Sequence, residues 1–215
     1  MKLQVLIADD HPVIRHGLRS LLHECADLEV AGEAADGHAL MQMIRVRPWC
    51  LLVMDLAMPG RNGLDLIKMI KAEQSRLPVL VFSAYREELY AVRAIRAGAA
   101  GYLSKKAQAD QLLLAMRHVA SGSVHYSQKV SELLANDSMR DTDHLPHTRL
   151  TDREYGIFSR IINGAKLTEI ADELSLSIKT VSTHKSNIME KMTLGGQVAM
   201  VRYAIEHKLL DDARG

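Results

Sequence analysis

Short apolar runs alternate with longer amphipathic stretches over roughly the first 120 residues of the chain. Between the runs, apolar residues recur at helical spacing, as Leu18 and Leu22 do four positions apart and Leu64 and Ile67 three apart, which is the spacing of one helix face. Apolar strands separated by amphipathic helices are typical of a parallel sheet covered on both faces. We therefore predict a doubly wound, flavodoxin-like α/β domain with a five-stranded parallel sheet. The predicted strands are LQVLIA (3–8), LEVAGEA (28–34), LLVMD (51–55), PVLVFSA (78–84) and GYLS (101–104).

A different pattern begins near residue 148. Segments with helical spacing of apolar residues follow one another directly, and the turns between them are too short to contain the strands of βαβ units. Thr151 can cap a first helix, because Glu154 stands three positions on as in a capping box, and Ser177 can cap a later one. We predict a small all-α domain. Its helices run from Thr151 to Asn163-Gly164 and then over Leu167–Leu174, Ile178–Met192 and Gln197–Lys208.

The segment between these two patterns is polar and turn-prone. It contains one short helical candidate, Ser127 to Leu134, followed by NDSMRDTDHLPH (136–147), whose composition is that of a linker. We therefore predict a first domain over 1–121, a linker with a short helix over 122–147, and a helical domain over 148–215.

The composition limits the classes of function. The 215 residues carry a net charge of only +1, so any nucleic-acid surface must be a local stripe. Cys25 and Cys50 are too few for a disulfide framework, and we expect both to be small core residues. The first residues lack a signal-peptide pattern, and no apolar run approaches the ~20 residues needed to span a bilayer. We expect a soluble, cytoplasmic protein with no membrane contact.

Polar side chains stand at the ends of the predicted strands. Asp9 and Asp10 follow the first strand, Asp55 ends the third, Ser83 lies at the end of the fourth, and Lys105 comes just after the fifth. These ends converge at one edge of a parallel sheet. Three crowded carboxylates need a cation, and oxygen ligands suit Mg²⁺, while a hydroxyl and an ammonium suit phosphoryl oxygens. The pattern therefore predicts a site where a carboxylate accepts a phosphoryl group.

The motifs that carry these residues resemble the receiver domain of two-component response regulators. They are IADDHP, VMDLAMPGRNGLDLI, VFSA and AGAAGYLSK, and the resemblance covers residues 3–120. It implies that Asp55 is the phosphoacceptor, which attacks the phosphohistidine of a sensor histidine kinase or a phosphotransfer protein. It also implies a Mg²⁺ site and a switch. Asp10, Asp55 and the Ala57 carbonyl would bind the ion with Asp9 assisting through water, Ser83 and Lys105 would hold the phosphoryl oxygens, and Tyr102 would reorient on activation.

The helical domain contains a helix, a tight turn at Ser175–Ser177 and a longer helix, which is the order of a helix-turn-helix. In the longer helix Val181, Ile188 and Met192 are spaced to face the core. The opposite face is short, polar and cationic, which suits contacts with phosphates and base edges. That face carries Lys179, Ser182, Thr183, Lys185 and Ser186, with Lys191 as a further candidate.

The stretch LTDREYGIFSRIINGAKLTEIADELSLSIKTVSTHKSNIMEKM resembles the LuxR-type helix-turn-helix of NarL/FixJ-class response regulators, over residues 148–210. The resemblance implies a regulator of transcription that is phosphorylated and then binds double-stranded DNA as a homodimer. The helix over Gln197–Lys208 would supply the dimer face. By position, the DNA-contacting residues would be Lys179, Thr180, Ser182, Thr183, Lys185 and Ser186.

Two alternatives stay open at this point. The helical domain could act mainly by protein–protein interaction, in which case duplex DNA would not retain the protein even at low salt. An aspartyl-phosphate hydrolase would need a second acid two residues after its nucleophile, where this chain has Ala57. We therefore expect a regulator that catalyses only its own phosphorylation and dephosphorylation.

Overall fold

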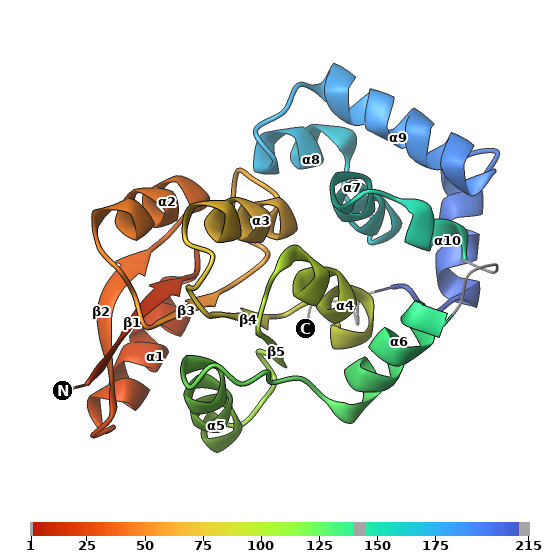
Figure 1. Ribbon diagram of the computed structural model, residues 1–215. Coiled ribbons are helices and arrows are strands. Elements are labelled where there is room, and N and C mark those ends of the chain that lie inside the picture. The colour runs from red at the N-terminus through yellow and green to blue at the C-terminus, as the bar shows by residue number, and fades with distance from the viewer. Residues whose placement is uncertain (1, 140–144, 211–215) are drawn as a thin grey trace. The chain divides into compact units, whose positions relative to one another are not determined.

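The computed structural model describes residues 2–139 and 145–210 (Figure 1). The chain divides into two compact units, Met1–Leu134 and Ala135–Gly215, which are described separately below. Within the described ranges, no helix combines the length and the apolar character needed to cross a membrane. The predicted linker over 136–147 lies partly outside these ranges, since 140–144 are not among the described residues.

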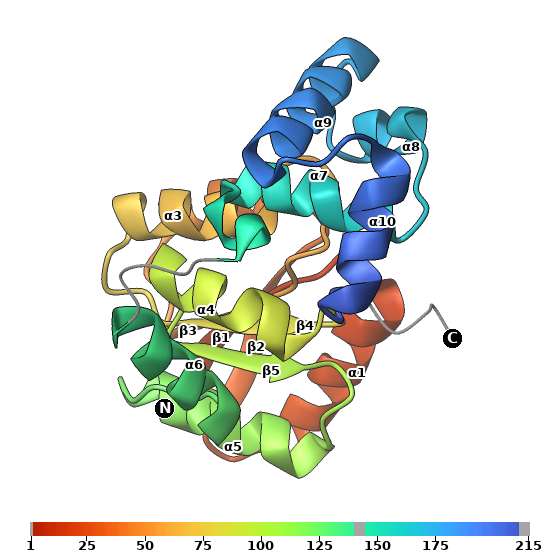
Figure 2. The ribbon, with the colours of Figure 1, turned by 90° about the vertical axis from the view of Figure 1, so that its right-hand side faces the viewer.

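The first unit is built on a five-stranded sheet in which every strand pairs in parallel (Figure 2). The strand order is β2-β1-β3-β4-β5, as expected for a doubly wound fold. The prediction of the fold class is confirmed, and the strand ends differ from the predicted ones by one residue at most. The strands are β1 (Leu3–Ala8), β2 (Leu28–Ala34), β3 (Leu51–Met54), β4 (Val79–Ser83) and β5 (Gly101–Ser104).

Helices cover both faces of this sheet. On one face, α1 and α5 pack their buried residues, among them Leu22 and Met116, against Val5, Ile7 and Val53. On the other face, α2, α3 and α4 lie side by side (Figure 1). The helices are α1 (Pro12–His23), α2 (Gly37–Val46), α3 (Gly63–Glu73), α4 (Glu87–Ala97) and α5 (Ala109–Ala120).

The direction of the chain reverses between β1 and β3. After β1 the chain adds β2 on one side, and after β2 it returns to add β3 on the other side of β1. The carboxyl ends of β1 and β3 therefore lie next to each other, with Ala8 opposite Met54 in the register. Ligands of open α/β sheets bind at such a reversal, so the segments that follow Ala8 and Met54 occupy the position where a site is expected.

The segment after α5 extends the sheet at its β5 edge. His125 forms a parallel bridge with Gly101, because the Tyr102 amide donates to the His125 carbonyl (2.9 Å) and the His125 amide donates to the Ala100 carbonyl (3.0 Å). The next helix, α6, runs from Gln128 to Met139 and buries Val130 completely. It is longer than the predicted Ser127 to Leu134, because no Gly or Pro interrupts the sequence as far as Met139.

Trp49 fixes the connection between α2 and β3. It is 7% exposed, and its indole Nε1 donates to the Met43 carbonyl (3.0 Å), while the Arg47 guanidinium lies 4.0 Å above the ring. The indole packs on Gly32, which has no side chain, at the point where the register between β1 and β2 shifts. The next residue, Cys50, is exposed, contrary to our expectation, whereas Cys25 is buried.

Gly32→Ala is expected to lower the free energy of unfolding by about 1–3 kcal/mol, because overpacking forces side chains out of their rotamers. A β-carbon there would lie 2.5 Å from Trp49 Cη2 and 2.8 Å from Met43 Cε. Urea unfolding followed by the fluorescence of Trp49, the chain's one tryptophan, measures the change. The matched control is Gly17→Ala in α1, where no atom lies within 4 Å of the new methyl group. It should instead raise stability by about 0.5–1 kcal/mol, and equal effects of both variants would refute the packing argument.

The second unit is helical. Its core contains Ile157 and Phe158 of α7, Val181 and Ile188 of α9, and Met200 of α10, each fully buried. Thr151 and Glu154 form the predicted capping box, and the Ser177 hydroxyl accepts from the Thr180 amide at the start of α9. The helices are the 3₁₀ helix η1 (Pro146–Arg149), α7 (Asp152–Ile162), α8 (Leu167–Glu173), α9 (Ile178–Met192) and α10 (Gln197–Glu206).

Candidate functional site

Four loops bring the predicted pocket residues together at the carboxyl edge of the sheet. Asp9 directly follows β1, Asp55 follows β3, Ser83 is the last residue of β4, and Lys105 follows β5. The Asp55 amide donates to the Ala8 carbonyl (2.8 Å), and the Lys105 amide donates to the Ser83 carbonyl (2.9 Å), so backbone bonds hold the loops in register. Asp55 and Asp9 are each 2% exposed. The structure thus gathers residues that lie far apart in the sequence into one buried acidic pocket.

Both oxygens of the Asp55 carboxylate have partners. The Ser83 hydroxyl donates to Oδ1 (2.6 Å), and the Lys105 ammonium donates to Oδ2 (2.6 Å). Lys105 also lies 2.6 Å from Asp9 Oδ2, so its ammonium bridges two of the carboxylates. Burial alone would lower the pKa of Lys105, but the Asp55 and Asp9 carboxylates outweigh it and raise that pKa above its usual value. Lys105 therefore stays cationic in the pocket.

The loop after Asp55 is shaped by a close backbone contact. Asn62 caps α3 by accepting from the Leu64 amide (2.9 Å), and Gly63 packs so closely on Leu56 that a β-carbon would lie 2.6 Å from its backbone. The Ala57 amide donates to Asp55 Oδ1 (3.2 Å), which places Ala57 beside the pocket. These contacts hold the loop at Ala57 and at Asn62, and Gly63 is needed where the loop meets α3.

A metal ion fits the residues at the mouth of the pocket. Ligand atoms of Asp9, Asp10, His11 and Asp55 all lie within 4.8 Å of one another. Asp10 Oδ1 is buried and accepts no hydrogen bond of good geometry, although His11 Nδ1 lies 2.8 Å from it. The Lys105 ammonium pairs with Asp9 and Asp55, while Asp10 is a third carboxylate in the same group, so the carboxylates outnumber the ammonium that pairs with them. The carboxylate oxygens of this set suit a hard divalent cation.

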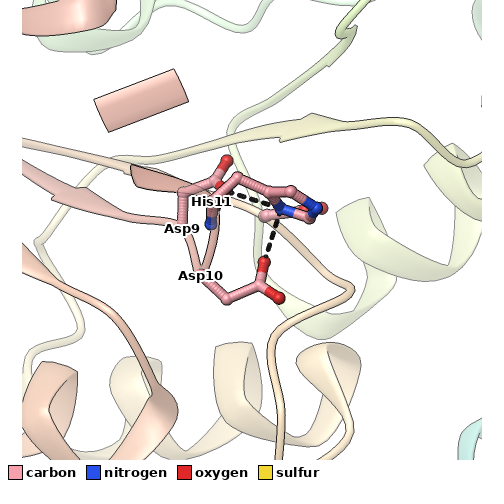
Figure 3. Close-up of side chains that lie close together, drawn as sticks. Asp9, Asp10 and His11 are labelled. Carbon is pink, nitrogen blue, oxygen red and sulfur yellow. Dashed lines mark hydrogen bonds and ion pairs between the residues drawn. The ribbon is translucent and has the colours of Figure 1, made fainter. Parts of the chain in front are cut away.

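His11 belongs to this group, although no pattern in the sequence predicts it. Figure 3 shows its imidazole beside the carboxylates of Asp9 and Asp10. The available signal was its position directly after the two acids, at the start of the first helix. A lone histidine there carries no recognisable spacing, so only the three-dimensional arrangement reveals it.

Tyr102 is a buried residue of the edge strand β5 and contacts the loop after β4. It is 1% exposed, and its hydroxyl donates to the Tyr85 carbonyl (2.9 Å), two residues past Ser83. The Tyr85 ring stacks on Tyr90 of α4, with the ring centroids 4.4 Å apart. The backbone amide of Tyr102 is held by His125. Tyr102 thus connects the pocket side of β4 with α4 and with the segment that follows α5.

In the second unit, α9 presents the predicted polar face to solvent. Val181, Ile188 and Met192 are buried, as predicted from their spacing. Lys185 is partly buried and its ammonium donates to Gln197 Oε1 (2.8 Å) at the start of α10. The other members of the predicted DNA-contacting set are exposed, and these are Lys179, Thr180, Ser182, Thr183 and Ser186.

Lys191, the further candidate on this face, has a structural contact instead. Its ammonium lies 2.7 Å from Glu154 Oε2, and Glu154 also accepts from the Thr151 amide and hydroxyl (both 2.9 Å). Burial alone would raise the pKa of Glu154, but the bonds from Lys191 and Thr151 outweigh it and lower that pKa. The pair joins the start of α7 to the end of α9.

Glu154→Gln is expected to lower the stability of the second unit by about 1–2 kcal/mol near neutral pH, because a capping bond and an ion pair weaken together. Since the folded pKa lies below the unfolded one, near 4.3, the carboxylate's contribution is complete above that value and is lost as the pH falls further. Urea unfolding followed by circular dichroism from pH 7 to pH 3 should therefore show wild type and variant converging in acid. Glu206→Gln, an exposed change in α10, is the control and should leave stability unchanged. A gap that stays constant with pH would contradict this account.

Comparison with known proteins gives two family matches that together span most of the chain. Residues 5–117 match the response regulator receiver domain, and residues 148–204 match the bacterial regulatory proteins of the luxR family. The chain is 36% identical to the oxygen regulatory protein NreC of Staphylococcus haemolyticus, over 97% of this chain and 100% of that one. It is 32% identical to the response regulator GacA of Pseudomonas aeruginosa, over 98% and 99% of the two chains.

Solved structures of the RcsB response regulator from Salmonella typhimurium are similar along nearly the whole chain. One superposes with a TM-score of 0.71 at 30% identity and covers 95% of this chain and 98% of that one. A second, bound to the promoter rprA in the presence of the phosphomimetic BeF₃⁻, has a TM-score of 0.68 at 28% identity and covers 94% and 98%.

Proposed function

The chain belongs to the NarL/FixJ class of two-component response regulators, and from this we propose that it is a phosphorylation-controlled, DNA-binding regulator of transcription. The observation that supports the proposal most directly is the environment of Asp55. Its carboxylate lies at the reversal point of a receiver-type sheet, between a hydroxyl and an ammonium. The proposed parts are a receiver over 1–121, a linker over 122–147 and a LuxR-type helix-turn-helix domain over 148–215.

Asp55 accepts the phosphoryl group from the phosphohistidine of a sensor histidine kinase, from a phosphotransfer protein or from a small acyl phosphate. One Asp55 oxygen forms the new bond to phosphorus while the bond from phosphorus to the donor breaks, and the donor keeps that electron pair. Ser83 and Lys105, which hold the two Asp55 oxygens, would then bind the oxygens of the phosphoryl group. Catalysis is limited to the protein's own phosphorylation and dephosphorylation.

Mg²⁺ is the proposed cofactor. Asp10, Asp55 and the Ala57 carbonyl would hold it, with Asp9 assisting through a water molecule. When bound, the ion would offset the negative charge that the phosphoryl group adds to three carboxylates. The unsatisfied Asp10 oxygen and the excess of carboxylates over ammonium support this assignment.

Ser83 and Tyr102 would transmit the effect of phosphorylation from the pocket to the neighbouring surface. If Ser83 turns from Asp55 towards the phosphoryl group, the loop that contains Tyr85 moves with it, and Tyr85 supplies the acceptor for the Tyr102 hydroxyl. Tyr102 in turn holds His125, and Glu87 of α4 accepts from the Ser127 amide (3.2 Å). A phosphoryl group adds close to two negative charges, which is enough to shift such an arrangement. The linker is therefore in contact with the elements that the switch would move.

The output is binding of a homodimer to double-stranded DNA through the exposed face of α9, with α10 as the proposed dimer face. The similar RcsB structures include a promoter complex and dimers bound to DNA, which supports this output. Half-sites would be centred about one helical turn, or ~10 bp, apart. This role places the protein in the cytoplasm.

Selection from a random duplex pool tests the proposal. Protein treated with an acyl phosphate and Mg²⁺ should enrich a paired-site sequence, and untreated protein should enrich it less. Binding should weaken steeply as salt is raised. Failure to retain any duplex at low salt, with or without treatment, would favour the alternative in which the helical domain binds a protein partner.

A further inference from the structure

His11 occupies a helix-capping position without acting as a cap. It is the residue before Pro12, the first residue of α1, and its side chain makes no capping bond to the helix. Its backbone amide donates to Asp9 Oδ1 (2.9 Å), which holds the residue against the pocket. The imidazole lies instead beside the carboxylates of Asp9 and Asp10 (Figure 3). Its orientation is therefore set by the pocket rather than by the helix.

The spacing of these atoms matches ligands that share one ion. His11 Nδ1 lies 2.8 Å from Asp10 Oδ1 and 3.3 Å from Asp9 Oδ1. Two ligands at right angles around an ion, each about 2.1 Å from it, are separated by roughly 3.0 Å. The Asp55 carboxylate lies near the same atoms, since all four ligand atoms fall within 4.8 Å of one another. An ion in this group would have an imidazole nitrogen within reach in addition to carboxylate oxygens.

The His11 side chain is also accessible to ions and water, since it is 62% exposed while Asp9 is nearly buried. Imidazole nitrogen is a good ligand for transition ions, whereas Mg²⁺ keeps oxygen ligands. A site with both imidazole nitrogen and carboxylate oxygen therefore differs in its affinity for transition ions and for Mg²⁺. His11 would add binding energy for a transition ion and little or none for Mg²⁺.

We propose that His11 is a metal ligand of the phosphoacceptor pocket, and that it makes the site favour divalent transition ions such as Mn²⁺ over Mg²⁺. This inference rests on the proposed function, because it requires the acidic pocket to bind a divalent cation. It extends the cation site from oxygen donors to a mixed nitrogen and oxygen set. The rate of phosphorylation would then depend on which divalent ion is available.

Mn²⁺ is the probe for the test. Mn²⁺ prefers octahedral coordination and is paramagnetic. Among the divalent first-row metal ions it binds most weakly to nitrogen and oxygen ligands, so isolated surface histidines retain little of it. This matters because His118 and His125, with their Nδ1 atoms 3.5 Å apart, form another imidazole pair in the first unit. Full-length protein without a histidine tag is titrated with Mn²⁺, and the concentration of free Mn²⁺ is measured by electron spin resonance. Pulsed resonance on the bound ion detects a directly coordinated ¹⁴N nucleus.

The wild-type protein should show ¹⁴N coupling that excess Mg²⁺ removes. His11→Ala should abolish the coupling and weaken Mn²⁺ binding roughly tenfold or more, while Mg²⁺ affinity, measured by competition, changes by less than about twofold. His16→Ala, which removes an exposed imidazole from α1, is the matched control and should resemble wild type. Circular dichroism confirms that each variant is folded.

Two results would overturn the inference while leaving the proposed function intact. Coupling to ¹⁴N could persist in His11→Ala, or the affinities for Mn²⁺ and Mg²⁺ could change together, as they would if His11 only positioned or screened the acids. The variant Asp10→Asn tests whether the acidic pocket binds a cation at all. If wild type and Asp10→Asn bind both ions equally, the acidic pocket is not the cation site, and both the inference and the proposed Mg²⁺ site fall.

Discussion

Asp55→Asn protein is expected to incorporate no phosphoryl group from a radiolabelled acyl phosphate, whereas wild type becomes labelled in the presence of Mg²⁺. The amide keeps the size of the carboxylate but lacks the anionic oxygen that must form the bond to phosphorus. The rest of the pocket should keep its structure in the variant. The Asn side-chain carbonyl can still accept a hydrogen bond from Ser83 or Lys105, which in the wild type bind the two Asp55 oxygens. Labelled protein is measured after gel separation.

Asp110→Asn, an exposed change in the first turn of α5, is the matched control and should be labelled like wild type. Loss of labelling in both variants would indicate a general effect of charge rather than of the acceptor. Labelling of Asp55→Asn at the wild-type level would show that another residue accepts the phosphoryl group, and the assignment of Asp55 would be wrong.

The pocket could be foreseen because four of its residues stand at or directly after the carboxyl end of a strand. Asp9, Asp55, Ser83 and Lys105 stand at strand ends that the apolar pattern located to within one residue. A parallel sheet places such ends at one edge, so local sequence and general topology suffice to bring the residues together. The assignment of chemistry to each residue came from the family resemblance. The distances in the pocket are consistent with that assignment.

Contacts between side chains that carry no sequence pattern could not be foreseen. Lys191 shares the polar side of α9 with Lys179 by helical spacing, yet it reaches back to Glu154 in α7. His11 follows two acids but matches no metal-ligand spacing, and its role depends on where the helix after it begins. The Tyr85–Tyr90 stack likewise depends on the turn that leads into α4. Tertiary geometry decides such contacts, and alternation or periodicity in the sequence does not encode them.

The double variant Lys179→Glu/Lys185→Glu is expected to lower affinity for duplex DNA by roughly a hundredfold at moderate salt and to flatten its salt dependence. Each lysine that neutralises a phosphate releases condensed counterions, and a glutamate in its place repels the backbone. Lys179 is exposed in the first turn of α9, and Lys185 lies on the same helix with its ammonium at Gln197. Affinity is measured by fluorescence anisotropy over a series of salt concentrations.

The control Lys68→Glu/Arg76→Glu changes the net charge equally but lies in the first unit, at exposed positions on α3 and in the turn after it. If binding depends on a local stripe, as the net charge of +1 requires, this control should keep most of the affinity and its full salt slope. Equal losses in both variants would point to unspecific attraction instead of a recognition face. Unchanged binding in the α9 variant, with its helicity intact, would exclude α9 as the DNA-contacting helix and return the helical domain to the protein-interaction alternative.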